Sequence, residues 1–216
     1  MSHILEGKLL YDITVPLSSG TVCFPGDLPP SITRQSDVVN GDSLTASYLK
    51  IGCHVGTHID APCHFLAGGL TVDALPLETF YGPAEVVDCR NQMVITAAYL
   101  QSLSIPPARH ILLQTDNSAL LHQPSFHENY TVMSPEGASY LCTLCPLSIG
   151  FDYYCLDPLA SDKGFPAHMI FATAGISVFV CLDLLNIQEG QYLFAGFPLR
   201  LEGAEGSPVR ALLIER

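Results

Sequence analysis

The sequence predicts a mixed α/β (α+β) fold, organised as a single domain over residues 1–216 around a central sheet. Three observations support this prediction. The length suits one domain, and segments with the pattern of strands outnumber those with the pattern of helices. Hydrophobic residues make up 48% of the chain, which is enough to build a sizeable core.

The elements follow from apolar patterns that are bounded by proline and glycine. We expect eight strands, at Leu9–Val15, Ala46–Ile51, Ala84–Cys89, Ile111–Gln114, Ser148–Phe151, Ile176–Leu182, Tyr192–Phe194 and Val209–Ile214. Two helices are predicted from their start signals, with Thr96 capping Ala97–Leu103 and Ser134-Pro135 opening a helix through Leu144. The apolar run Met169–Leu182 is too short to span a bilayer and is expected to be core.

Charge and cysteine content restrict the class of protein. The net charge is −12 with only nine Lys and Arg, which argues against binding to nucleic acid and favours a small-molecule substrate. The first residues lack a basic start and an apolar stretch, and the chain has eight cysteines, so we expect reduced thiols in the cytoplasm. Cys142 and Cys145 have the spacing of half a zinc ribbon or a redox pair, but no second pair accompanies them and a structural role is expected.

Several catalytic signatures are absent from the sequence. It contains no phosphate-binding loop, no Gly-x-Gly-x-x-Gly after a strand and no Gly-x-Ser-x-Gly turn. Cys53 and Cys63 each precede a histidine, and we expect both to pack near a site and not to act as nucleophiles.

The run from His54 to His64 carries the chemistry. His54, His58, Asp60 and His64 lie within eleven residues, and imidazole with carboxylate is a ligand set that zinc or manganese favours. A fully extended segment would separate its two ends by about 30 Å, too far to share an ion. Gly56 and Pro62 disfavour a continuous helix. The sequence therefore predicts a metal site on a loop that turns back on itself.

The same residues resemble a known family. The pattern His54-x-Gly-Thr-His58-x-Asp60-Ala-Pro-x-His64-Phe resembles the signature of the putative cyclase family, which includes bacterial kynurenine formamidase and isatin hydrolase. Similar stretches occur at 12–17, 24–27, 75–78, 82–84, 157–158 and 206–211, so that the resemblance covers nearly the whole chain. It implies a swivelling β/β/α-like fold and a metal-dependent hydrolase of a small-molecule amide or cyclic amide.

The resemblance also implies roles for individual residues. His54, His58 and Asp60 would bind the first metal, and Asp60 would bridge to a second metal that His168 also holds. His64 would donate and accept protons, and Phe24 would contact the substrate. It further implies a homodimer or homotetramer.

One departure from the family pattern changes the expected metal content. The glutamate of the second metal is expected twelve residues after His168, where this chain has Val180. Valine cannot ligate, so we predict one Zn or Mn ion per chain, with His168 free to act as an acid or base or to contact substrate. Two other functions stay open: a metal-dependent cyclase, lyase or dehydratase, and a pseudoenzyme that retains one metal site.

Overall fold

A computed structural model describes residues 2–5, 8–159 and 164–216. The strands are β1 Ser2–Leu5, β2 Lys8–Asp12, β3 Ser31–Ser36, β4 Ala46–Lys50, β5 His58–Asp60, β6 Tyr81–Asp88, β7 Val94–Ile95, β8 His110–Gln114, β9 Val132–Met133, β10 Ser148–Phe151, β11 Ser177–Val180, β12 Gly190–Pro198 and β13 Gly206–Glu215. The helices are α1 Ala97–Ser102, α2 Asn117–Leu120, α3 Pro135–Thr143 and α4 Pro166–Thr173. Four short 3₁₀ turns cover Val38–Asn40, Pro62–His64, Val72–Ala74 and Leu77–Thr79.

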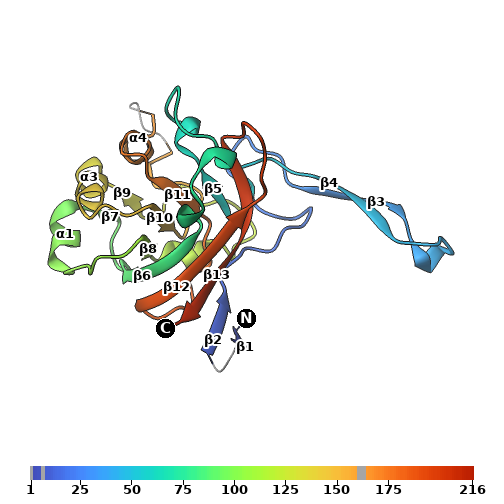
Figure 1. The fold of residues 1–216 in the computed structure, drawn as a ribbon, viewed down its shortest axis with the longest axis horizontal. Helices are drawn as coiled ribbons and strands as arrows, with labels where there is room; N and C mark the ends of the chain where they lie inside the picture. The colour runs from blue at the N-terminus through green and yellow to red at the C-terminus, as the bar shows by residue number, and fades with distance from the viewer. Residues whose placement is uncertain (1, 6–7, 160–163) are drawn as a thin grey trace.

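A nine-stranded mixed sheet organises the fold, which confirms the predicted central sheet. Its order is β1-β2-β13-β12-β6-β8-β10-β11-β5, and β5 also pairs with β13, so that the sheet curls round and closes on itself. Helices α1, α3 and α4 lie together on one side of the body (Figure 1). Strands β6, β8, β10 and β11 run parallel, and every residue of β8, β10 and β11 is buried. Parallel strands covered on both faces are mostly apolar, and here the buried polar residues stand at the strand ends.

Both predicted helices are present with the expected starts. The Thr96 hydroxyl accepts a hydrogen bond from the backbone N–H of Tyr99 (3.2 Å), which caps α1. The Ser134 hydroxyl does the same for Gly137 in α3 (3.1 Å). Each cap satisfies a backbone donor that the first helical turn leaves free.

The strand predicted at Ile176–Leu182 is present, but the sequence analysis missed the helix that precedes it. Residues 166–173 form a helix, Gly175 turns the chain at a φ of 72°, and the strand covers only Ser177–Val180. A buried helix and a buried strand are both apolar throughout, so periodicity cannot separate them. Five strands (β1, β3, β5, β7 and β9) and helix α2 were also not predicted. None of the helices in the described ranges is long and apolar enough to cross a membrane.

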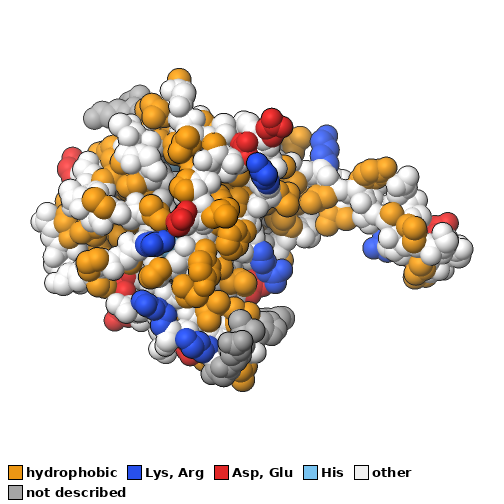
Figure 2. All heavy atoms as spheres, viewed as in Figure 1, with side chains coloured by type: hydrophobic (Ala, Val, Ile, Leu, Met, Phe, Trp, Pro, Cys, Tyr) orange, Lys and Arg blue, Asp and Glu red, His pale blue; other side chains and the backbone are white. Residues whose placement is uncertain are grey.

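Strands β3 and β4 form a two-stranded arm that projects far from the body (Figure 1). Neither of its faces packs on a core, since most of its residues are exposed. Hydrophobic side chains run along the arm (Figure 2), and the large exposed ones are Ile32, Val38, Val39, Leu44, Tyr48 and Leu49. A free two-stranded hairpin is only marginally stable in water.

Candidate metal centre

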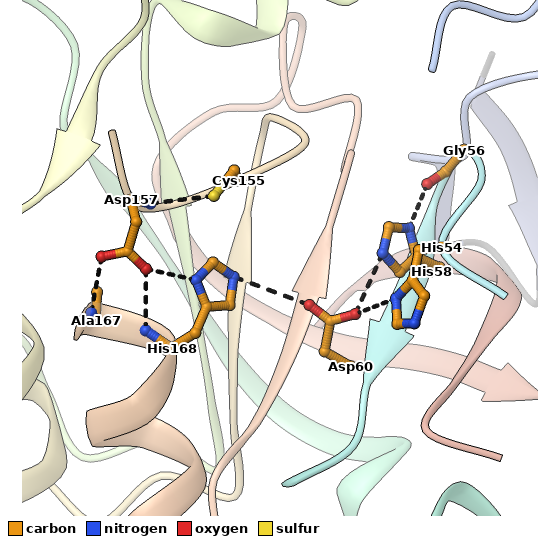
Figure 3. Close-up of polar contacts among 8 residues, drawn as sticks. All are labelled: His54, Gly56, His58, Asp60, Cys155, Asp157, Ala167 and His168. Carbon is orange, nitrogen blue, oxygen red and sulfur yellow. Dashed lines mark hydrogen bonds and ion pairs between the residues drawn. The ribbon is translucent and has the colours of Figure 1, made fainter. Parts of the chain in front are cut away.

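Strand β5 and the turn before it bring together three side chains of the kind that can ligate a metal. Asp60 Oδ1 lies 2.8 Å from His54 Nδ1 and 3.2 Å from His58 Nε2. One atom from each of these residues lies within 4.8 Å of the others, an arrangement that could hold a metal ion. His58 and Asp60 are alternate residues of one strand, so both side chains emerge on the same face. Figure 3 shows both imidazoles converging on the Asp60 carboxylate.

The turn that carries His54 depends on Gly56 and Thr57. Gly56 has a φ of 68°, a conformation that favours glycine, and it reverses the chain between His54 and β5. The buried Thr57 hydroxyl donates to the carbonyl of Cys181 (2.6 Å) and accepts from the N–H of Val15 (2.8 Å). The chain therefore turns before and after β5, as the predicted loop requires. The prediction missed strand β5 itself, which pairs with β11 on one side and β13 on the other.

A carbonyl group fixes the orientation of the His58 ring. His58 Nδ1 lies 2.7 Å from the carbonyl oxygen of Gly56. A carbonyl only accepts hydrogen bonds, so Nδ1 carries a proton and Nε2 is the ring nitrogen that is directed at Asp60. This second hydrogen bond is the usual support of a metal-ligating histidine.

The electrostatics of the cluster keep the carboxylate ionised. Burial raises the pKa of Asp60, but the neighbouring imidazoles of His58 and His54 outweigh burial and hold this pKa well below its ordinary value. Burial lowers the pKa of His54, but the hydrogen bond and negative charge of Asp60 have the larger effect. The pKa of His54 is therefore raised above its ordinary value. An anionic oxygen between two imidazoles is a donor set that suits a zinc or manganese ion.

His168 lies on the other side of the same carboxylate. Its Nε2 is 3.8 Å from Asp60 Oδ2, and its Nδ1 donates to Asp157 Oδ2 at 2.6 Å (Figure 3). Asp157 is completely buried and also accepts from the N–H groups of Ala167 (2.8 Å) and His168 (3.2 Å) at the start of α4. Asp157 therefore orients the ring so that Nε2 points into the site.

His64 and several aromatic rings complete a pocket of about 250 Å³. The 3₁₀ turn after β5 stacks the His64 ring on that of His54, with 4.0 Å between ring centroids, and burial lowers the pKa of His64. Four aromatic side chains line the same pocket: Phe24, Phe65, Tyr154 and Phe165. Phe65 also packs on His168 at 4.6 Å between centroids.

A second group of possible ligands fits an ion poorly. Cys155, Asp157 and His168 also lie within 4.8 Å of one another. However, Asp157 already accepts three hydrogen bonds, and burial raises the pKa of the Cys155 thiol to about 12, so it stays protonated. Val180 is fully buried in β11, opposite His58. Of these two groups in the described ranges, the one at His54, His58 and Asp60 fits a divalent ion better.

The structure brings the six predicted site residues to one pocket: Phe24, His54, His58, Asp60, His64 and His168. Their individual roles stay predictions. His122 lies outside this pocket and pairs with Asp183 (3.2 Å) on the surface. Sequence reasoning missed Glu205, whose Oε1 lies 3.3 Å from His54 Nε2, and it assigned no role to Asp157. Only the neighbouring family-like stretches, at 206–211 and 157–158, drew attention to these positions.

The fold and the site together define an α/β protein with a closed mixed sheet and a cluster of histidine and carboxylate side chains. The family described as "Putative cyclase" matches residues 11–158, and the chain belongs to this family. A kynurenine formamidase from Geobacillus thermodenitrificans is 34% identical over 202 residues, which cover 94% of this chain and 95% of that protein. Cyclase-like protein 1 of Oryza sativa is also 34% identical, over 97% of this chain and 80% of its own length.

Solved structures show the same architecture. A potential metal-dependent hydrolase with cyclase activity superposes with a TM-score of 0.82 at 28% identity, covering 96% of this chain and 98% of that one. Isatin hydrolase A from Ralstonia solanacearum gives a TM-score of 0.82 at 25% identity, over 96% and 92% of the two chains. The mixed α/β fold is thus shared along almost the full length.

Proposed function

We propose that this chain is a metal-dependent hydrolase that cleaves the C–N bond of a small-molecule amide or cyclic amide. One observation carries the proposal: His54, His58 and Asp60 converge in the pocket that His64 also lines. Relatives named kynurenine formamidase support it, and so does the structural similarity to isatin hydrolase A.

The residues of the pocket have separate roles in the proposed reaction. His54, His58 and Asp60 would hold a divalent ion, which would supply Lewis-acid polarisation of a carbonyl and make water more acidic. Burial lowers the pKa of His64, so its ring is neutral at pH 7 and ready to accept a proton, which it then delivers to the leaving nitrogen. His168, oriented by Asp157, contacts the substrate or moves a second proton from the opposite side.

The pocket walls favour a flat aromatic substrate. Phe24, Phe65, Tyr154 and Phe165 surround the polar centre, and a volume of about 250 Å³ suits a compact ring system. Rings of this kind gain contact area and quadrupole interactions with a planar substrate. We therefore place aryl formamides and small benzo-fused lactams first among the candidates, with Phe24 as a substrate contact.

The test is turnover of aryl formamides, isatin and simple lactams by protein loaded with zinc or manganese. Replacing His64 by Ala is expected to reduce the rate by about 10²–10⁴-fold while metal binding is retained. An undiminished rate in this variant removes His64 from the mechanism. A ligand that binds without any turnover indicates the pseudoenzyme.

A second candidate function is a cyclase, lyase or dehydratase that uses the same residues. The relative named cyclase-like protein 1 and the solved hydrolase described with cyclase activity favour it. Hydrolysis incorporates one oxygen atom from water into the product, whereas elimination or cyclisation does not. Turnover in ¹⁸O-labelled water followed by mass spectrometry separates the two functions.

We further propose one zinc or manganese ion per chain, since the position expected to supply the second site's carboxylate holds Val180. The eight free cysteines suit a reducing cytoplasmic compartment, within a single domain over residues 1–216. The arm of β3 and β4 supports a homodimer or homotetramer, because its exposed Val39 and Leu49 gain burial against another copy. Sedimentation equilibrium of a Val39→Ser, Leu49→Ser variant tests this assembly, with a shift to monomer expected.

A further inference from the structure

Glu205 lies behind the metal centre, on the side of His54 that faces away from Asp60. His54 Nδ1 is directed at Asp60 Oδ1 (2.8 Å), whereas His54 Nε2 is directed at Glu205 Oε1 (3.3 Å). The two nitrogens of one imidazole ring thus meet two different carboxylates. Within the described ranges, Glu205 is the one hydrogen-bond partner of His54 Nε2.

An ion at this centre requires a bare nitrogen at His54 Nδ1, so the ring proton must reside on Nε2. A proton on Nε2 is stabilised when an acceptor faces it, and a carboxylate is the strongest acceptor available in a protein. This arrangement of carboxylate, imidazole and metal orients the ligand and increases its basicity. Gly56 provides the corresponding support for His58 through its carbonyl oxygen.

The backbone holds Glu205 in this place. Its carbonyl oxygen accepts from the N–H of Ala61 (2.9 Å), immediately after the metal-binding strand, and the next residue, Gly206, pairs with Asp60 in register. A Cβ at Gly206 would come within 2.6 Å of His54 Cε1. The segment therefore fits the His54 ring in two ways. Glu205 provides a hydrogen-bond acceptor for the ring, and Gly206 leaves room for it because it has no side chain.

We propose that Glu205 is a positioning residue that accepts the Nε2–H of His54, fixes its tautomer and strengthens metal binding. The inference rests on the proposed function, because it requires His54 to be a ligand. Glu205 does not reach the ion itself, since its carboxylate lies on the opposite side of the ring from Nδ1. Its side chain is 46% exposed, so the expected effect lies at the weaker end of the usual range.

The test measures metal affinity by competition with a chelator, using zinc alone. Glu205→Ala removes the acceptor, and Glu205→Gln keeps an acceptor without the charge. Glu202→Ala is the matched control, because it removes the same charge from an exposed position in the same loop. We expect Glu205→Ala to bind zinc about tenfold more weakly, Glu205→Gln to be intermediate, and Glu202→Ala to match the wild type.

A second measurement reports the tautomer directly. In ¹⁵N NMR spectra of the zinc-loaded protein, His54 is expected to show a protected Nε2–H that exchanges rapidly in Glu205→Ala. Equal zinc affinity of wild type and Glu205→Ala, or an equal loss in Glu202→Ala, overturns this inference alone. Failure of the wild type to bind zinc overturns the proposed function as well, so the two failures are distinguishable.

Discussion

Replacing Gly206 by Ala tests the geometry of the metal centre, because the added Cβ would press on the His54 ring and on the backbone oxygen of Ile59. The added Cβ would lie 2.6 Å from His54 Cε1 and 3.1 Å from His54 Nδ1. Carbon atoms in contact prefer separations of about 3.5–4.0 Å, so the ring must move by roughly 1 Å. Gly206 has no positive φ, and alanine therefore adds no backbone strain of its own.

The expected effect on metal binding is large. Functional groups must be held within about 0.5 Å of their productive geometry, and a misplacement of about 1 Å can cost roughly 10²-fold. At an ion concentration of about 100 times the wild-type Kd, the ion stabilises the wild type by about 2.7 kcal/mol. With a Kd about 100-fold higher, the same concentration stabilises the variant by only about 0.4 kcal/mol.

The assay is thermal unfolding with and without zinc. A change of 1 kcal/mol shifts Tm by about 2–4 °C in a chain of this size, so zinc should raise the wild-type Tm by about 5–10 °C and the variant Tm by about 1–2 °C. Gly20→Ala is the control, because the nearest atom to its added Cβ is a serine hydroxyl at 3.7 Å. An unchanged zinc-dependent shift in Gly206→Ala would show that the ring of His54 can move without loss of the ion, and would refute the reasoning.

Three further predictions concern buried groups. Asp157→Asn places an amide donor against the N–H groups of Ala167 and His168, and urea titration should show a loss of about 2–4 kcal/mol in the free energy of unfolding. Burial lowers the pKa of His110 from 6.5 to about 4, so the unfolded chain binds more protons between these values. Stability should thus fall by about 3 kcal/mol as the pH drops from 6.5 to 4, and this contribution should vanish in His110→Leu. Val180→Glu puts a carboxylate opposite His58 in register, and metal analysis should then detect two ions per chain, whereas one ion would show that a carboxylate there does not complete a site.

The local signals in the sequence were sufficient for much of the fold. Thr96 and Ser134 cap helices where predicted, because capping depends on a few adjacent residues. Strands β8 and β10 follow from short apolar runs. Helix α4 was missed because a buried helix next to a buried strand offers no amphipathic pattern.

The candidate site likewise has a part that local sequence predicts and a part that depends on distant contacts. The motif from His54 to His64 is local, and its residues come together as the compact spacing and the resemblance predict. Glu205 and Asp157 act through contacts with residues 151 and 11 positions away, respectively. No periodicity or spacing links such pairs, so they emerge only when the strands are assembled.

The pairing of β5 with both β11 and β13 has a consequence for biosynthesis. Strand β5, which carries the candidate metal ligands His58 and Asp60, is three residues long and is held in place by segments that the ribosome makes more than a hundred residues later. Contacts this distant along the chain close late and slowly. Nascent chains should therefore remain metal-free until β13 has emerged, and loading with the ion should follow the last steps of folding instead of nucleating the first.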